Sequence, residues 1–172
     1  IAAWLHDCGK VATPEAVVDK GTKLETIYDR IHTVATRFEV LKRDEEIKYL
    51  KKQLKIQKDD SLIENQKKEA LKKARTLYLK RIKQQEDDKS FIEESNVGGE
   101  FMSQERKDRV NKIASYRWKD NGSPKPFFSE DEVYNLCISR GTLTPEERKI
   151  INDHIVVTID MLEQLPYPKH LR

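Results

Sequence analysis

The chain has few cysteines and no long apolar run. Its 172 residues include only two cysteines, Cys8 and Cys137, which lie far apart and have no CxxC neighbour. With no signal peptide nearby, we expect both to be reduced thiols in a cytoplasmic compartment. No apolar stretch approaches the roughly 20 residues needed to cross a bilayer. We therefore expect no membrane contact by this chain.

Neither sign of charge dominates. The chain carries 33 Lys and Arg against 30 Asp and Glu, which gives a net charge of +3. Because such a mixture produces no broad cationic field, we do not expect a nucleic acid polymer as partner. Only 37% of the residues are hydrophobic and another 37% are charged. These proportions predict solvated helices that protrude from a modest core.

Helical periodicity is the main structural signal. Apolar residues recur in steps of three and four from Leu24 to Leu41, and a thinner apolar seam continues to Ile56. We expect a break at residues 58–61 and a second helix, rich in Lys and Glu, that reaches at least Ile82. Two long charged helices joined by a tight turn predict an antiparallel hairpin.

Capping residues mark the later helices. The strongest start is Thr144-Pro145-Glu146-Glu147, and weaker starts lie at Ser103, for a helix to about Trp118, and at Ser129. Residues 120–126 are expected to form a loop, because Asn, Gly, Ser and Pro cluster there. Since no segment alternates convincingly as a strand, the predicted fold class is all-α.

The pair His6-Asp7 is the best candidate for chemistry. An imidazole beside a carboxylate can place two ligand types on one divalent ion, and these ligands suit iron, manganese, zinc or magnesium. Gly9 permits a close backbone approach, and Lys10 adds a cation nearby. From spacing alone, a structural helix end explains the pair about as well as a metal site does.

Two histidines compete to complete such a site. The run Lys20-Gly21-Thr22 echoes Arg140-Gly141-Thr142, and each is followed by a helix with one histidine, His32 or His154. A lone histidine on a helix with apolar neighbours is more often a packing residue than a ligand. The residues alone leave both candidates open.

The motifs together resemble a known family. His6-Asp7-Cys8-Gly9-Lys10, followed by Pro14-Glu15 and Lys20-Gly21, resembles the opening of the HD superfamily catalytic core, specifically its HD-GYP branch of cyclic di-GMP phosphodiesterases. The segment from Gly141 through Thr144-Pro145-Glu146-Glu147 to His154 is similar to that family's LTxEE helix start and ligand histidine. The resemblance implies a partial HD helical core, made of residues 1–24 and 140–172, with a helical insertion at residues 25–139.

The resemblance also implies roles for individual residues. His6, Asp7 and His154 would bind divalent ions, iron, manganese or similar, with two ions in the complete domain and Asp7 bridging them. Asp7 and Lys10 would be catalytic, Lys10 lying near the scissile phosphate. A metal-bound hydroxide would hydrolyse a phosphodiester, with a cyclic dinucleotide or another phosphoester as substrate. The resemblance favours His154 over His32, because Thr144-Pro145-Glu146-Glu147 matches the family's helix start more closely.

This chain lacks several features of that family. The upstream ligand, the paired histidines and the GYP signature are absent, and the chain opens without Met inside an apolar segment. We expect a piece of a longer polypeptide, which by itself binds metal weakly and hydrolyses nothing. The alternative is a catalytically inert helical module of a signalling protein, which forms a homodimer or binds a protein partner through the insertion.

Overall fold

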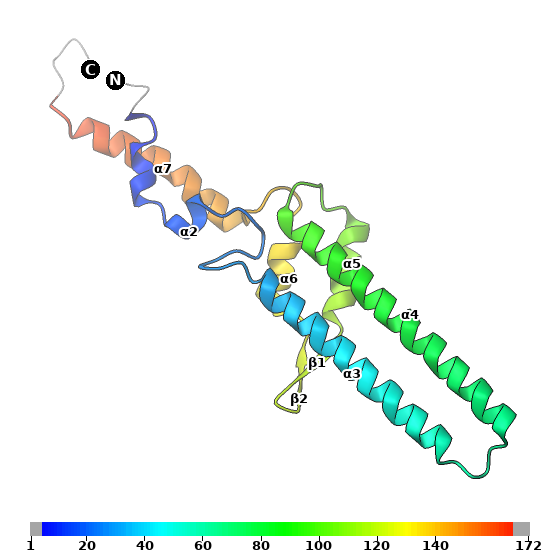
Figure 1. Ribbon diagram of the computed structural model, residues 1–172. Helices are drawn as coiled ribbons and strands as arrows, with labels where there is room; N and C mark the ends of the chain where they lie inside the picture. The colour runs from blue at the N-terminus through cyan, green and yellow to red at the C-terminus, as the bar shows by residue number, and fades with distance from the viewer. Residues whose placement is uncertain (1–4, 167–172) are drawn as a thin grey trace.

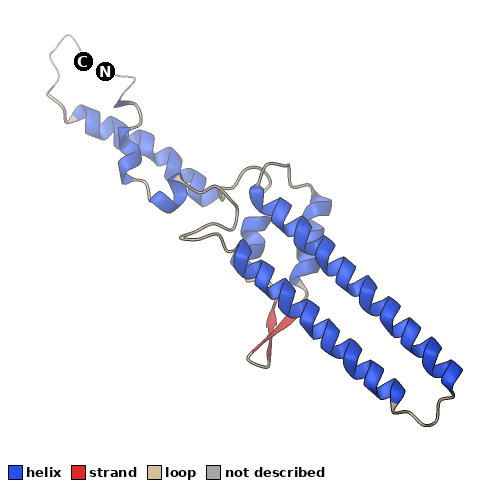
Figure 2. Cartoon of the chain, viewed as in Figure 1, coloured by secondary structure: helices blue, strands red, loops and turns tan. Residues whose placement is uncertain are grey.

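The computed structural model describes residues 5–166 of the chain. Helices dominate this part, which confirms the predicted all-α class, and its only strands form one small hairpin (Figure 2). The elements are, in order, η1 (Cys8–Ala12), α2 (Glu15–Val18), α3 (Ile31–Gln57), α4 (Glu64–Val97), α5 (Gln104–Ala114), β1 (Arg117–Asp120), β2 (Ser123–Pro126), α6 (Glu130–Leu136) and α7 (Pro145–Glu163).

The elements group into two regions. η1 and α2, from the start of the chain, pack against α7, from its end, and these three form what we call the small lobe. Helices α3 to α6 and the β-hairpin form the body. Figure 1 shows the small lobe at one end of the molecule and the tip of the α3–α4 hairpin at the other. Among residues 5–166, no helix is long and apolar enough to span a membrane.

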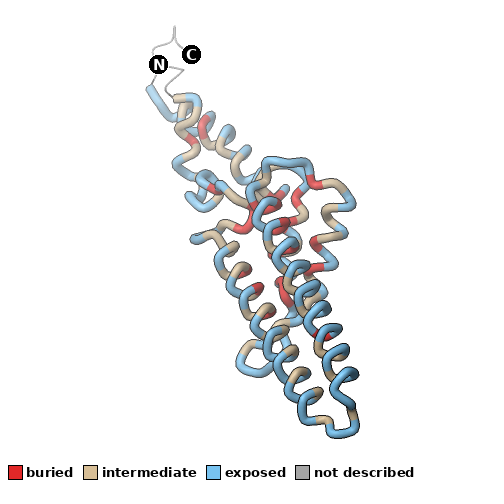
Figure 3. The backbone as a smooth tube through the Cα atoms, turned by 45° about the vertical axis from the view of Figure 1, so that its right-hand side comes forward, coloured by how far each residue is buried: buried red, intermediate tan, exposed pale blue. Residues whose placement is uncertain are grey.

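The long helices α3 and α4 form the predicted antiparallel hairpin. The break falls where it was expected, since α3 ends at Gln57 and α4 begins at Glu64. Tyr49 and Tyr78 stack between the two helices with their ring centroids 4.7 Å apart. Figure 3 shows buried residues mainly where the hairpin meets the body, whereas the outer part is largely exposed. The hairpin is thus a solvated arm on a small core.

The start of the first long helix was predicted wrongly. The apolar stripe suggested a helix from Leu24, but α3 begins only at Ile31. In between, a Glu25 carboxylate oxygen accepts the Gly21 N–H at 2.7 Å, and Asp29 accepts the Ile31 N–H at 2.9 Å. Short acidic side chains that bond to nearby backbone groups compete with the helix for those groups. The segment therefore folds as consecutive turns.

The predicted loop at residues 120–126 is instead part of an antiparallel β-hairpin. α5 ends at Ala114, short of the expected Trp118. Strand β1 then pairs with β2 in a register that places Arg117 opposite Pro126. Asn121 and Gly122 have positive φ angles of 48° and 82°. Two such residues in succession form the tight turn that matches the twist of paired strands. The Asn-Gly dipeptide was the sequence signal for this hairpin.

The core of the body forms where the base of the α3–α4 hairpin meets α5 and α6. Phe38 and Phe127 are both fully buried and meet edge to face, with ring centroids 4.7 Å apart. A buried ion pair crosses the same region, because Arg37 donates to Glu132 at 2.7 Å and 3.1 Å. These contacts fix α6, and residues 137–144 connect it to α7.

Candidate metal centre

A close contact at Gly9 holds η1 against α7. The buried Gly9 N–H donates to Thr158 Oγ1 at 2.9 Å, across 149 residues of sequence. A Cβ at Gly9 would lie 2.1 Å from the His154 carbonyl oxygen and 2.5 Å from Thr158 Oγ1. Because any side chain would push the two segments apart, only glycine allows this approach. The contact brings the His6-Asp7 pair beside His154.

The carboxylate of Asp7 is the centre of the site. Its Oδ1 lies 3.4 Å from His154 Nε2, and its Oδ2 lies 3.3 Å from His6 Nε2. The Lys10 ammonium donates to Oδ2 at 2.7 Å. The structure thus brings together all four residues singled out from the sequence. Whether they ligate metal or act on a substrate is a separate question, and those roles stay predictions.

Neighbouring side chains favour the ionised form of Asp7. The hydrogen bond from Lys10 is the main reason that the pKa of Asp7 lies below its usual value, and the charges of His6, Lys10 and His154 lower it further. The carboxylate is accessible, since 41% of its side chain is exposed, whereas the His154 side chain is only 14% exposed. An ionised and accessible carboxylate beside a partly buried imidazole is suited to bind a cation.

His154 is oriented by its own helix. Its Nδ1 lies in hydrogen-bonding contact with the Ile151 carbonyl oxygen, so this nitrogen is assigned the proton. The other ring nitrogen, Nε2, then faces Asp7. Metal-binding histidines commonly donate their other ring N–H to a backbone carbonyl in this way, which fixes the tautomer and the ring plane. The arrangement suits a ligand histidine.

The donor set fits part of a metal site. Two nitrogen or oxygen ligands on one tetrahedral ion lie about 3.4 Å apart, given bonds of about 2.1 Å, and both imidazole-to-carboxylate distances are close to this value. However, the two imidazoles face different oxygens of Asp7. Among residues 5–166, no three or more His, Cys, Asp or Glu side chains form a group that could hold an ion. The described residues therefore supply some ligands of a metal centre and not a full set.

The other candidate histidine lies elsewhere. His32 is exposed in the first turn of α3, in the body, where its backbone carbonyl accepts the Thr36 hydroxyl at 3.0 Å. The structure brings His154, and not His32, to the His6-Asp7 pair. This placement agrees with the preference drawn from the Thr144-Pro145-Glu146-Glu147 helix start.

The position of α7 depends on a buried lysine that the sequence reasoning missed. Lys20 Nζ donates to both carboxylate oxygens of Glu147, at 2.9 Å and 2.8 Å, and to Asn135 Oδ1 at 3.0 Å. Its side chain is only 1% exposed. Glu147 also closes the capping box of α7 with Thr144. Lys20 therefore ties the first turn of α7 to the end of α6.

The two ends of residues 21–141 meet in space. The Thr142 hydroxyl donates to the Lys20 carbonyl oxygen at 3.2 Å, although the two residues are 122 positions apart. Beside this point, the Lys23 N–H donates to the Asn96 carbonyl at 2.8 Å. Residues 21–141, which include the whole body, therefore leave and re-enter the small lobe at neighbouring points.

Comparison with known families finds a match to part of the chain. The family model of the HD domain matches residues 127–172, a segment that includes α6, α7 and His154. The match begins before the expected boundary at residue 140 and does not include His6 or Asp7. No curated protein and no solved structure matches the chain significantly. The family match supports the HD superfamily, whose domains are generally metal-dependent hydrolases.

Proposed function

We propose that the chain is part of a metal-dependent phosphohydrolase of the HD superfamily. In this proposal, residues 1–24 and 140–172 are two pieces of the catalytic core, and residues 25–139 are a helical insertion. One observation carries the proposal: His154 Nε2, in the segment that matches the HD domain, lies 3.4 Å from Asp7 Oδ1, in the distant His6-Asp7 motif. The hydrogen bond from Thr142 to the Lys20 carbonyl, where the ends of residues 21–141 meet, supports the insertion.

The residues of the chain have distinct tasks in this chemistry. His6, Asp7 and His154 would hold a divalent ion, which when bound lowers the pKa of water and neutralises phosphoryl charge. Lys10 keeps Asp7 ionised, and its ammonium, with the side chain 42% exposed, is able to reach a phosphate oxygen in the same place. Gly9 sets the distance between the two halves of the site. Loss of His6, Asp7 or His154, or of the close approach at Gly9, should weaken ion binding.

The finer assignment is to the HD-GYP branch, with a phosphodiester such as a cyclic dinucleotide as substrate and two ions in the complete domain. It is supported by the HDxGK motif at residues 6–10 and by the Thr144-Pro145-Glu146-Glu147 helix start. Because the described residues hold only part of a ligand set, this chain by itself should bind metal weakly and show no hydrolysis.

Titration calorimetry with Mn²⁺ tests the proposed site. Asp7→Asn and His154→Ala should each weaken Mn²⁺ binding by about tenfold or more, as the loss of one ligand does in other sites. His32→Ala is the matched control and should leave binding unchanged. If His32→Ala weakens binding while His154→Ala does not, the proposed ligand set is wrong.

The second candidate function is that of an interaction module. Ile47, Leu50 and Leu54 follow one another at helical spacing on α3, and their exposed fractions are 49%, 47% and 55%. Exposed apolar residues on one helical face favour a contact with a second copy or a protein partner. Deleting residues 42–89 should then abolish self-association in analytical ultracentrifugation. An unchanged oligomeric state would remove the support for this candidate.

A further inference from the structure

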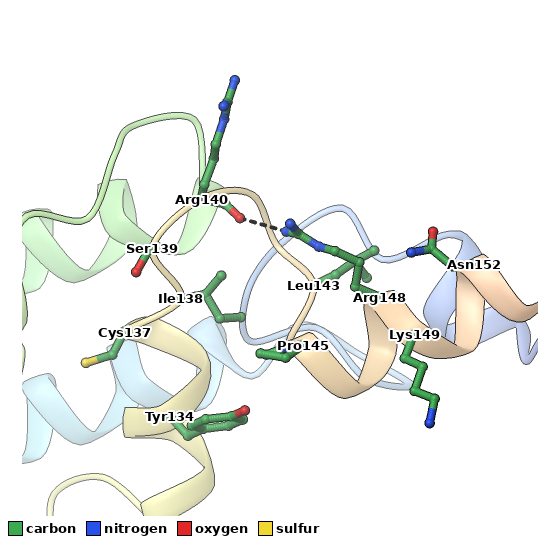
Figure 4. A pocket seen from close by; sticks show the side chains of 10 residues that line it. All are labelled: Tyr134, Cys137, Ile138, Ser139, Arg140, Leu143, Pro145, Arg148, Lys149 and Asn152. Carbon is green, nitrogen blue, oxygen red and sulfur yellow. Dashed lines mark hydrogen bonds between the residues drawn. The ribbon is translucent and has the colours of Figure 1, made fainter.

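A pocket of about 710 Å³ lies where the α6–α7 connection meets α7. Its wall is made by Tyr134, by residues 137–140 and by Leu143, together with residues of the first two turns of α7 (Figure 4). The volume falls within the range of small-molecule sites, about 300–1,000 Å³. The pocket is therefore large enough for a ligand of nucleotide size.

The pocket is separate from the candidate metal centre. Arg148, Lys149 and Asn152 line it from α7, and Asn152 precedes His154 by only two residues. Because successive helical residues are rotated by about 100°, Asn152 and His154 lie on nearly opposite faces of α7. A ligand in this pocket would thus lie across the helix from Asp7. Nothing in the proposed hydrolase chemistry uses this face.

The charged residues that line the pocket are all basic. Arg140, Arg148 and Lys149 are among its ten lining residues, and none of the ten is an Asp or Glu. Glu146 accepts the hydroxyl of Tyr134, a lining residue, at 2.9 Å, so one negative charge lies at the Tyr134 end of the wall. The positive end of the α7 dipole lies at the same place. An anion is the charged group that this wall favours.

Among the described residues, several N–H donors of the Arg148 guanidinium have no acceptor. In the described part of the chain its side chain makes one hydrogen bond, to the Arg140 carbonyl oxygen at 3.1 Å, which leaves the other guanidinium N–H groups unused. In Figure 4 the Arg148 side chain extends from α7 toward the Arg140 carbonyl, with Asn152 farther along α7, whereas the guanidinium of Arg140 points away. By contrast, Arg37, Arg106 and Arg109 in the body are all paired with carboxylates. Arg148 is thus placed to hold a phosphate by a charge-assisted contact.

The remainder of the wall is apolar. Ile138, Leu143 and Pro145 supply aliphatic surface, and the Tyr134 ring lies near Pro145 in Figure 4. Such a surface accommodates a flat aromatic group, with stacking available from the ring. We propose that this pocket binds a nucleoside monophosphate, with Arg148 holding the phosphate and Tyr134 contacting the base.

Titration calorimetry with adenosine 5′-monophosphate on the 172-residue chain tests this site. Arg148→Gln should weaken binding by about tenfold or more, because it removes a charge-assisted contact. Arg75→Gln, which changes another exposed arginine, on α4, is the matched control and should bind like the unaltered chain. Adenosine and inorganic phosphate should each bind more weakly than the intact nucleotide, and Tyr134→Leu should weaken the nucleotide but not inorganic phosphate.

Two results would overturn the proposal. The first is an Arg148→Gln variant that binds the nucleotide as the unaltered chain does, or an unaltered chain that does not bind it at all. The second is a loss of nucleotide binding in His154→Ala, which would assign the nucleotide to the candidate metal centre. Retained binding in His154→Ala, together with loss in Arg148→Gln, is the expected result and does not depend on the hydrolase proposal.

Discussion

The body and the small lobe are each stabilised by different interactions. The body has a core of buried apolar side chains from α3, α4, α5 and α6, with Phe38, Ile92, Val110 and Leu136 fully enclosed. The helices of the small lobe bury only Gly9 and Thr158. Three apolar side chains on α7 stay at least half exposed: Ile155 at 55%, Val156 at 57% and Ile159 at 50%. The candidate metal centre thus lies in the less stabilised region, as functional elements often do.

Removing a core side chain should have the largest effect on stability, and this effect should fall on the body. Phe38→Ala deletes a fully buried ring that packs on Phe127, and we expect a loss of about 3–5 kcal/mol in the free energy of unfolding of the body. Chemical denaturation, followed by tryptophan fluorescence, measures this loss. A cost below about 0.5 kcal/mol, the range of surface changes, would contradict the account of the core.

The small lobe should instead be destabilised by a change at Gly9, where its backbone segments are in close contact. Gly9→Ala places a Cβ against the His154 carbonyl and should cost about 1–3 kcal/mol, confined to the packing of η1 on α7. Hydrogen exchange should become faster in α7 and stay unchanged in α4. Gly99→Ala is the matched control, because a Cβ there meets no atom within 4 Å. Equal effects of the two alanines would show that the close approach at Gly9 does not hold the lobe.

The connection between the regions depends on Lys20. Lys20→Met keeps the length of the side chain but leaves the buried Asn135 amide oxygen and the Glu147 carboxylate without their donor, at a cost of about 1–3 kcal/mol. The first turn of α7 should then exchange its amide hydrogens faster, while the core of the body is unaffected. Lys80→Met, at an exposed position of α4, is the control and should change neither.

The free energy of unfolding of the body should also depend on pH, through Lys23, and this effect should be smaller than those of the substitutions above. Burial lowers the pKa of Lys23 from 10.5 to about 8, and the Lys23 ammonium donates to the Leu136 and Ile138 carbonyls. Because the folded pKa lies below the unfolded one, the unfolded state binds more protons above pH 8, and the free energy of unfolding should rise with pH. The Cys137 thiol, whose pKa is raised by burial, acts in the opposite direction above its ordinary value of 9.

The test window is therefore between pH 8 and pH 9. The urea midpoint of the unaltered chain should increase across it, and Lys23→Met should remove most of that slope. A slope that persists unchanged in Lys23→Met would mean that another group causes it.

Local signals in the sequence were sufficient for much of this structure. The capping residues Ser103, Ser129 and Thr144 each accept the backbone N–H that the helix-start pattern implies. Local signals also misled, because the apolar stripe from Leu24 did not reveal that Glu25 and Asp29 bond to nearby backbone groups. The Asn121-Gly122 turn was readable but was assigned to a loop. Each of these features depends on residues within a few positions of one another.

The candidate site needed contacts that no local pattern contains. The family resemblance named His6, Asp7, Lys10 and His154, but their meeting depends on Gly9 against Thr158, across 149 residues. The pairing of Lys20 with Glu147 likewise joins residues that lie 127 positions apart. Such contacts follow from how whole elements pack, so spacing within one segment does not predict them.

The convergence of the two distant segments on one ion is the central claim. It is tested most directly by adding Mn²⁺ to the chain and following the paramagnetic broadening of the histidine side-chain resonances by NMR. The imidazoles of His6 and His154 should broaden together at low Mn²⁺, with His32 unaffected, and Asp7→Asn should abolish the effect on both. Broadening of His6 without His154, or of His32 to the same extent as His154, would contradict the account.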